Sequence, residues 1–366
     1  MATVETKEES VVVVGETETR TPIFSVLVKR TYQIRPGRAM ERLPQASPLL
    51  RADVYYDDGD PESSTVKFEN DLAPYKLKTD VVAIARAYAP GGNPTREMGV
   101  GLAVGDYRKV IRVVGDRRCL YRSERAPAFT DPDPFTEMEI RYERAYGGID
   151  MRDDPVRMFP YPRNHQGVGF VLANTREAVE GLRLPNLEDP DDLLTPERVV
   201  LGEPERWNGQ PLPQGFGWFQ RTWYPRCSFV GSVPGFLDPD EVMREETLGL
   251  VPQRQIALAR RFKLPGFDVR FNNGASLGLA LPHLRGGEIV RLRNLTRDGA
   301  LDFYLPSDAP RLMLDIGLGE NTLEPALHTV CIRVEEMEAD LIWRGAHPYP
   351  GVDWLPEMKR LTALVA

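Results

Sequence analysis

Apolar and polar residues alternate along several stretches of the chain, a pattern typical of strands that place one face in a core. In FSVLVKRTYQI, residues 24–34, apolar side chains occupy nearly every second position and Arg30 interrupts them. The stretch DVVAIARAYAP, residues 80–90, indicates a second strand, which the glycine pair at residues 91–92 should end. We therefore expect the ordered part of the protein to begin with strands, after a loosely ordered, flexible tail over residues 1–20.

Two Gly-Asp pairs predict tight hairpins, because glycine and aspartate favour the primed turns whose twist matches that of the flanking strands. Gly105 and Asp106 stand between the stretches VGLAV and YRKVIRVV. Gly115 and Asp116 stand between YRKVIRVV and RRCLYR. The three stretches together predict a meander of antiparallel strands.

Further strand patterns follow later in the chain. Residues 137–146, EMEIRYERAY, predict a strand that ends at a glycine pair, and residues 328–345 predict a hairpin around the turn EEME. Helical patterns are short, and they are found in NTREAVEGL with a cap at Asn174 or Thr175, in residues 252–262 and in residues 355–365. The expected fold is mainly β, with a β-sandwich or meander-type sheets, long ordered loops and a few short helices.

The middle of the chain, from about residue 150 to 240, lacks periodicity and is rich in proline, glycine and aromatic residues. Disordered segments are poor in aromatic residues, so this stretch is expected to form ordered loops. We expect one β-rich domain over residues 21–347, which could divide into sub-domains of about 21–150 and 151–347. Residues 348–366 would form a C-terminal extension with a short helix.

Composition narrows the class of protein. The chain has 366 residues, 42% of them hydrophobic, which is enough for a sizeable core, and its net charge is −8. That charge argues against general binding to nucleic acid or anionic membranes, since both depend on clustered Lys and Arg. The sequence contains no run of about 18 apolar residues that would predict a membrane helix.

The first residues and the cysteines both indicate a cytoplasmic location. The opening MATVETKEES is acidic and lacks the basic region of a signal peptide. Cys119, Cys227 and Cys331 are far apart and odd in number, which suits free thiols in a reducing compartment.

Three acid-rich stretches, DDGDPE, DPDP and DPDD, resemble fragments of calcium loops. None has the alternate acids, turn glycine and distal glutamate of such a loop, and Asp-Pro runs are usually turns. The four histidines are dispersed, without zinc-ligand spacing. We therefore expect neither a metal ion nor a cofactor.

The segment GASLG places Ser276 in a G-x-S-x-G pattern, with Asp315 and then His328 or His347 following in the order of α/β-hydrolases. A nucleophile elbow requires a helix directly after its serine. The next residues, LGLALPHL, place a glycine and a proline in the first turns of that helix. A serine hydrolase using Ser276 is therefore an alternative and not the favoured interpretation.

Residues 108–125 carry seven Arg or Lys against two acids. On the predicted hairpins, Arg112, Arg118 and Arg122 could form a surface for an acidic partner, or a solvated face balanced by neighbouring acids. In RYERAYGG, Arg141 and Arg144 with Tyr146 could form a ligand clamp or a semi-buried ion pair.

The segment LPNLEDPDD, residues 184–192, contains four acids and two prolines. Its prolines stiffen the chain and Asn186 can bond nearby backbone, so the loop needs no metal. The carboxylates of Glu188, Asp191 and Asp192 are expected to stay hydrated and to be open to recognition by a partner.

Eight segments follow one another in the chain: FSVLVKRTYQI, ENDLAPYKLKTDVVAIARAYAPGG, VGDYRKVIRVVGDR, PFTEMEIRYERAYGG, NHQGVGF, LPNLEDP, GFGW and HTVCIRVEEMEADLIWRG. Taken in this order, they resemble the DUF2169 family of bacterial proteins over roughly residues 20–347. The resemblance implies an accessory protein of type VI secretion, an effector adaptor or chaperone that loads a toxin onto the secretion spike. Relatives often carry an Ala-Pro-Pro-rich segment where FNNGASLGLALP stands here, so the serine pattern is not a family motif.

The sequence thus favours a cytoplasmic adaptor, not an enzyme, whose partners are a secreted effector protein and a secretion spike protein. Trp218 and Trp223 could supply hot-spot side chains for such a partner, or they could belong to the core. A carbohydrate-binding β module is a further alternative, because exposed tryptophans near carboxylates also suit sugars.

Overall fold

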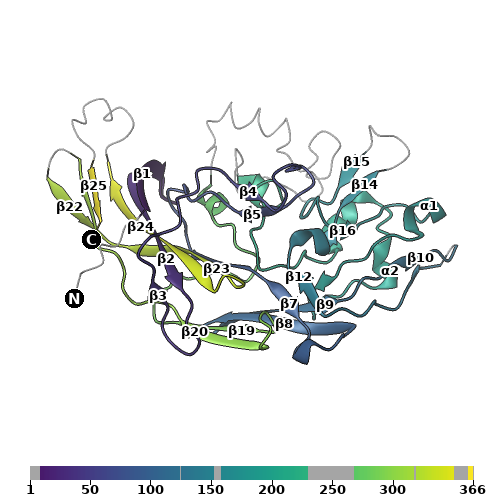
Figure 1. Ribbon diagram of the computed structural model, residues 1–366. Helices are drawn as coiled ribbons and strands as arrows, with labels where there is room; N and C mark the ends of the chain where they lie inside the picture. The colour runs from purple at the N-terminus through teal and green to yellow at the C-terminus, as the bar shows by residue number, and fades with distance from the viewer. Residues whose placement is uncertain are drawn as a thin grey trace, which may run out of the picture.

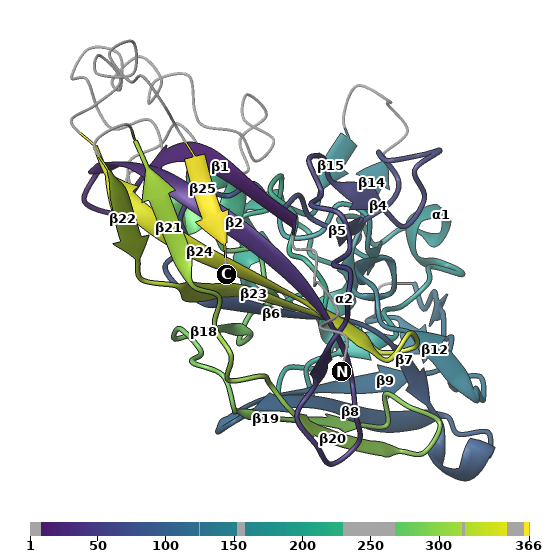
Figure 2. The same cartoon turned by 60° about the vertical axis from the view of Figure 1, so that its left-hand side comes forward.

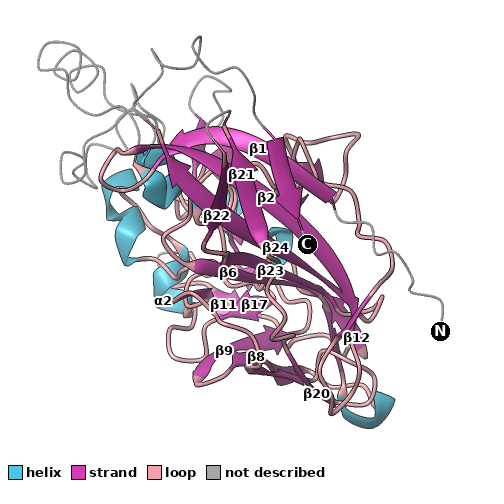
Figure 3. Cartoon of the chain, turned by 90° about the vertical axis from the view of Figure 1, so that its left-hand side faces the viewer, coloured by secondary structure: helices cyan, strands magenta, loops and turns pink. Residues whose placement is uncertain are grey.

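Two sheets dominate the computed structural model, and smaller sheets and loops surround them (Figure 1). The structure describes residues 9–123, 125–151, 158–229, 268–316, 319–349 and 362–365. Among these residues, no helix is long and apolar enough to cross a membrane. The predicted fold class, mainly β with long loops and a few short helices, is confirmed (Figure 3).

The larger sheet has seven strands, and all its neighbouring strands are antiparallel except β23 and β6. Its order is β1 (Glu9–Glu16), β2 (Pro22–Gln33), β24 (Glu338–Pro348), β23 (Ala326–Arg333), β6 (Thr79–Ile84) and β18 (Ala280–Leu281) (Figure 2). The strand β3 (Glu41–Arg42) also pairs with β2. The strand predicted from residue 24 and the hairpin predicted over residues 328–345 are confirmed. The strand predicted at residues 80–90 is divided between β6 and β7 (Arg86–Tyr88).

The expectation of a loose tail over residues 1–20 was wrong for Glu9–Glu16. These residues form β1, which pairs with β2 in an unbroken register from Glu9 opposite Lys29 to Glu16 opposite Pro22. The four consecutive valines are good strand formers, and Val12 packs against a buried cluster. Pairing with a long neighbouring strand therefore orders a segment whose polar flanks indicated a tail.

The second sheet has five strands in the order β17 (Leu187–Glu188), β9 (Tyr107–Val114), β8 (Glu97–Val104), β19 (Ile289–Arg293) and β20 (Ala300–Tyr304). The first predicted hairpin is confirmed, with Val104 opposite Tyr107 across a two-residue loop. Gly105 has φ of 57°, the left-handed conformation that this turn requires.

The second predicted hairpin was wrong. After β9 the chain forms β10 (Cys119–Leu120), which pairs with β11 (Ala128–Phe129), while β17 lies beside β9. A Cβ at Gly115 would lie 1.8 Å from the carbonyl oxygen of Asp133. This glycine therefore permits a close approach of two backbones and does not form a turn.

The strand predicted over residues 137–146 ends early. β12 (Glu137–Glu139) pairs with β7, and the chain then continues through the 3₁₀ turn η2 (Tyr142–Arg144) to β13 (Tyr146–Gly147), which pairs with β16 (Val168–Gly169). The turn places the Tyr142 ring edge-on against Trp223, with 5.0 Å between the ring centroids. Packing of this buried tyrosine overrides the local strand pattern.

Near the C-terminus, the prediction of a helix over residues 355–365 was wrong for the last four residues of that range. Thr362–Val365 forms β25, which pairs with β21 (Leu312–Asp315), itself paired with β22 (Glu320–Leu323). The remainder of that segment and the helix predicted at residues 252–262 lie outside the described residues.

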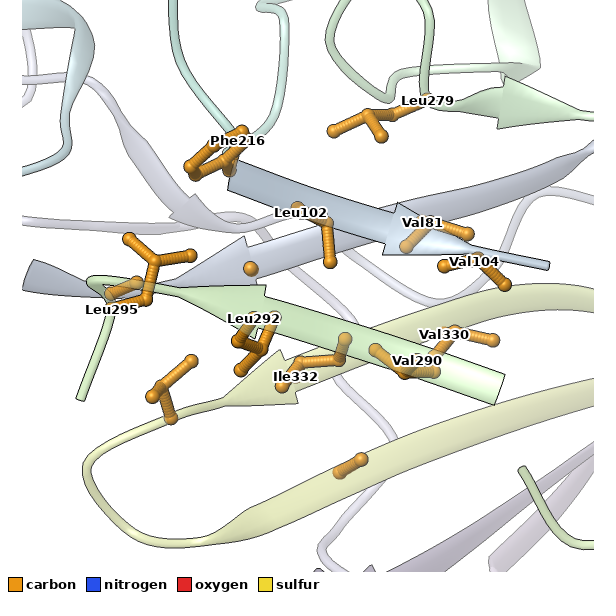
Figure 4. Packing of buried hydrophobic residues seen from close by; sticks show 14 of the residues in the cluster. Val81, Leu102, Val104, Phe216, Leu279, Val290, Leu292, Leu295, Val330 and Ile332 are labelled. Atoms are coloured by element: carbon orange, nitrogen blue, oxygen red, sulfur yellow. The ribbon is translucent and has the colours of Figure 1, made fainter. Parts of the chain in front are cut away.

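The two main sheets face each other across one hydrophobic core. Figure 4 shows Val330 and Ile332 of β23 packed toward Val290 and Leu292 of β19. The inward-facing residues of β8 and β9 join the same cluster. A second core lies among the loops that follow β9 and contains the buried Trp207.

Short elements complete the described chain. The helix α1 (Arg176–Val179) is capped as predicted by Thr175, whose hydroxyl oxygen accepts from the Ala178 amide at 3.2 Å. The others are β4 (Val54–Tyr55), β5 (Val66–Phe68), η1 (Pro90–Gly92), β14 (Ile149–Met151), β15 (Met158–Pro160), β16 (Val168–Gly169), α2 (Pro196–Val199), η3 (Pro204–Gly209), η4 (Arg226–Phe229) and η5 (Val269–Asn272).

Candidate functional site

A pocket of about 480 Å³ opens beside strand β9. Its walls are residues 108–110 of β9, residues 189–191 of the turn after β17, Gln214, and residues 277–278. We call this set of residues the β9 groove. Segments more than 150 residues apart in the sequence meet there, so only the tertiary structure forms it.

The strand β17 covers only one end of β9. Leu187 lies opposite Val113 and Glu188 opposite Arg112. In this register Pro190 would come opposite Val110, but proline has no N–H to donate to a ladder. The chain turns away instead, with the Asp192 amide donating to the Asp189 carbonyl oxygen at 3.2 Å.

Alternate residues of β9 direct their backbone groups to opposite sides of the strand. The Gly105 amide donates to the Ile289 carbonyl oxygen at 2.9 Å. Every second residue of β8, counted back from Gly105, therefore directs its backbone groups toward β19, and the residues between them direct theirs toward β9. On β9 itself, the Val114 amide donates to the Asn186 carbonyl oxygen at 2.8 Å, toward the β17 side.

It follows that the N–H and C=O groups of Arg108 and Val110 point away from β8 and into the β9 groove. Among the described residues, no strand pairs with this part of β9 on that side. The groove thus contains an open strand edge, which begins where Pro190 interrupts β17.

Exposed apolar side chains lie along this edge. Val110 and Leu277 line the groove and are 46% and 66% exposed, and Tyr107 at the start of β9 is 46% exposed. Arg108 on one wall and Asp191 on the other are also exposed, and neither forms an ion pair with any described residue. The groove therefore combines apolar contact area with charges of opposite sign.

The Lys109 side chain lies buried beneath the groove. Its Nζ donates to Ser276 Oγ at 2.5 Å and to the Leu277 carbonyl oxygen at 2.9 Å. Burial lowers the pKa of Lys109 to about 7, an effect that the nearby Asp189 carboxylate partly opposes. The two hydrogen bonds attach β9 to the segment that carries Leu277.

The surroundings of Ser276 differ from those of a nucleophile elbow. Its hydroxyl contacts the Lys109 amine, while Asp315 lies on β21 and His347 on β24. The Ser276 carbonyl oxygen accepts from the Leu279 amide in a turn that leads to β18, so a strand follows where the elbow needs a helix. His328 stacks on another histidine, with 5.0 Å between ring centroids.

Glu188 was expected to keep a hydrated carboxylate, and the structure corrects this. Its side chain is 3% exposed, and its carboxylate accepts from Arg112 at 2.8 Å and from Arg117 at 2.6 Å. Arg112 also contacts Glu97. Arg112 and Glu188 therefore form a partly buried ion pair between β9 and β17, and neither offers a free charge to a partner.

The other predicted basic residues lie outside the groove walls. Arg118 and Arg122 are exposed, and Arg118 donates to the Gly181 carbonyl oxygen at 2.9 Å. Arg144 donates to the Asn186 side chain at 3.2 Å.

The candidate clamp residues of RYERAYGG contact different partners. Arg141 pairs with Glu139 at 3.1 Å and lies 5.6 Å from the centroid of the Tyr56 ring, while Tyr146 is buried with its hydroxyl 3.2 Å from Gln210 Oε1. The alternative of a semi-buried ion pair describes Arg141 better.

Trp218 and Trp223 belong to the core. They are 4% and 0% exposed, so neither can serve as a surface hot spot or as a flat platform for a sugar. The Trp223 indole donates to Gln166 at 3.1 Å, and Lys76 lies 5.1 Å from the Trp218 ring centroid. Proline- and glycine-rich loops wrap these rings because burying them offsets the cost of ordering the loops.

Of the predicted partner-binding residues, only Asp191 lies in the wall of the β9 groove. Asp192 is engaged by Arg198 at 2.5 Å. Val110 and Leu277 were not among the residues predicted from the sequence. The alternation in YRKVIRVV indicated an outward Val110, but nothing local indicated which segment would lie beside it.

Among the described residues, no group of three or more His, Cys, Asp or Glu side chains is placed to hold a metal ion. In DDGDPE, Asp57 accepts from the Gly59 amide at 3.0 Å and Asp58 from the Tyr55 amide at 2.8 Å. These carboxylates stabilise a turn.

Comparison with known proteins gives one family. A family profile described as an uncharacterized protein conserved in bacteria (DUF2169) matches residues 19–344. No curated protein and no solved structure matches the chain.

Proposed function

Because the chain belongs to the DUF2169 family of conserved bacterial proteins, we propose that it is a cytoplasmic adaptor that binds a secreted effector and passes it to the spike of a type VI secretion system. The β9 groove is the observation that supports this function best. An adaptor needs exposed apolar surface flanked by charge, and the groove supplies both. The proposal includes no catalytic step, no cofactor, and neither nucleic acid nor membrane as a partner.

The predicted hot-spot residues Trp218 and Trp223 are buried, and exposed apolar side chains at the β9 groove take the role proposed for them. Val110 and Leu277 in the groove are 46% and 66% exposed, and Tyr107, which precedes the groove residues at the start of β9, is 46% exposed. Covering such side chains removes apolar area from water and stabilises a complex. Arg108 and Asp191 on opposite walls would orient the partner, since complementary charges favour one orientation over its reverse.

Binding of this kind protects a cargo by mass action. A protein that binds the folded effector, or a partly folded segment of it, lowers the concentration of free aggregation-prone states. Loss of the adaptor should therefore reduce the amount or the delivery of one specific effector encoded nearby.

A serine hydrolase is the alternative, and the contact between Lys109 Nζ and Ser276 Oγ is the observation that favours it. A lysine with a lowered pKa can act as a general base for a serine. Ser276, however, is only 1% exposed, so a substrate could reach its hydroxyl only if the side chains above it moved.

The test is deletion of the gene in the native host, followed by measurement of each secreted effector. One effector should be lost while assembly of the apparatus and secretion of other cargo continue. Restoring the wild-type chain should restore delivery, whereas Leu277→Asp should not. Leu120→Asp is the matched control, because Leu120 is also exposed, at 37%, but lies outside the groove.

Two outcomes would contradict the proposal. Loss of all secreted substrates on deletion would indicate a structural part of the secretion apparatus. Full restoration by Leu277→Asp would show that the β9 groove is not the binding surface.

A further inference from the structure

We propose that the β9 groove binds an extended segment of the partner polypeptide as an additional strand, antiparallel to β9 and in line with β17. This inference rests on the adaptor function proposed above and specifies how the partner is held. Its first support is the open edge. The backbone groups of Arg108 and Val110 point into the groove, and an extended chain pairs with alternate residues at this spacing.

The end of β17 sets the position of the added strand of the partner, which we call the guest strand. Its register would bring Pro190 opposite Val110, and the turn after Glu188 removes the chain from that place. A guest in the same line takes the vacated position opposite Val110 and continues toward Arg108. Antiparallel pairing is the more stable arrangement per residue, and it continues the direction in which β17 runs along β9.

The side chains along the groove specify the kind of segment. A guest residue opposite Val110 points to the same face of the sheet as Val110, which is 46% exposed, so an apolar side chain fits there. The next guest residue points to the other face, toward Leu277, and again suits an apolar side chain. The third lies opposite Arg108 and suits an acid.

The acidic turn at residues 189–191 indicates which kind of residue precedes the guest strand. The residue that precedes the guest strand would lie beside the exposed carboxylate of Asp191, where Lys or Arg fits best. The occupant is therefore an extended segment of another protein, with a basic residue followed by two apolar residues and an acid.

Strand addition accounts for the open edge, which side-chain contact alone would not require. Native proteins normally protect such edges, so an unprotected edge beside a groove is suited to pairing with a partner strand. Natural sheets cover such edges or keep them very short, since they invite pairing with other chains. Here the open part is limited to the half of β9 next to the hairpin, and apolar side chains and charges of both signs surround it. A main-chain ladder would supply affinity and the alternate side chains specificity.

The test uses the full chain and the effector that co-purifies with it from the native host. Val110→Pro removes the N–H that points into the groove, while the hydrogen bonds of β9 to β8 involve the neighbouring residues and remain. Val110→Thr keeps the N–H and the β-branched shape and is the matched control. We expect the proline variant to bind the effector at least about tenfold more weakly, and the threonine variant to bind within about twofold of wild type.

Hydrogen exchange of the unmodified protein provides a second measurement, should the proline variant fold poorly. The amides of Arg108 and Val110 should exchange at least about tenfold more slowly in the complex than in the free chain. If Leu277→Asp abolishes binding while Val110→Pro binds like Val110→Thr and these amides gain no protection, the groove binds by side chains only and strand addition is wrong. If all three variants bind like wild type, the effector binds elsewhere on the chain and strand addition at the β9 groove is wrong. If no effector co-purifies, the proposed function fails as well.

Discussion

Arg112 and Glu188 join strands β9 and β17 through an ion pair in which Nη1 of the arginine lies 2.8 Å from Oε2 of the glutamate. The Glu188 side chain is 3% exposed, and Arg117 approaches its other oxygen at 2.6 Å. This carboxylate therefore fixes the short strand β17 in place, and the place where β17 ends determines where the edge of β9 becomes open.

Replacing Glu188 by Gln should destabilise the protein by about 3 kcal/mol, because it leaves the buried Arg117 without its counter-charge. Urea denaturation would measure the change. Glu97→Gln is the control, since Glu97 contacts the same Arg112 but its side chain is 58% exposed, and it should cost less than about 1 kcal/mol. Equal losses in the two variants would show that burial does not strengthen the Glu188 contacts.

The stability of the protein should depend on pH through Lys109. Burial lowers its pKa in the folded protein from 10.5 to about 7. Between these values the unfolded chain binds a proton that the folded chain lacks, so the free energy of unfolding rises with pH. The rise should reach about 1.4 kcal/mol per pH unit and cease below pH 7, where both states are protonated.

Lys109→Met removes the titrating amine and isolates this effect. The difference in unfolding free energy between wild type and variant, measured by urea denaturation from about pH 6.5 to 9.5, should change in favour of the wild type as pH rises. A difference that stays constant would mean that the folded protein keeps the amine protonated throughout.

Ser276 should be dispensable for cargo binding. Ser276→Ala removes one acceptor from Lys109 Nζ but leaves the Leu277 carbonyl oxygen in place, so we expect a loss of about 1–2 kcal/mol in stability and unchanged binding. A fluorophosphonate probe should not label the wild-type protein. Labelling that Ser276→Ala abolishes would instead support the serine hydrolase.

Charge reversal should separate the groove from the rest of the basic stretch. Arg108→Glu, in the groove wall, should weaken effector binding more at low salt than at high salt, because screening reduces its attraction to a partner. The double variant Arg118→Glu and Arg122→Glu, at exposed positions outside the groove, should fold and bind normally. The reverse result would assign binding to the stretch that follows β9.

Chelators should leave the melting temperature unchanged, because the described residues contain no complete set of metal ligands. Thermal unfolding with and without EDTA measures this. A lower melting temperature that calcium restores would show that one of the acid-rich stretches binds a metal ion.

The sequence by itself determined the elements whose signals are local. Alternation from residue 24 and the Gly105-Asp106 pair specify a strand and a hairpin, because side-chain period and turn conformation depend on neighbouring residues only. The same signals failed at Gly115 and at Tyr142. There, a close backbone approach and the packing of a buried ring outweigh local preference.

The tertiary structure alone decided which segments meet at the candidate site. Glu188 lies 76 residues after Arg112 in the chain, and Ser276 lies 167 residues after Lys109. An acidic, proline-containing segment has the same local pattern whether its carboxylates are hydrated or buried, and a tryptophan in an aperiodic loop can be inside or outside. Burial and strand pairing are set by the sum of long-range contacts, so the open edge of β9 existed only once β17, the Ser276 segment and β9 had come together.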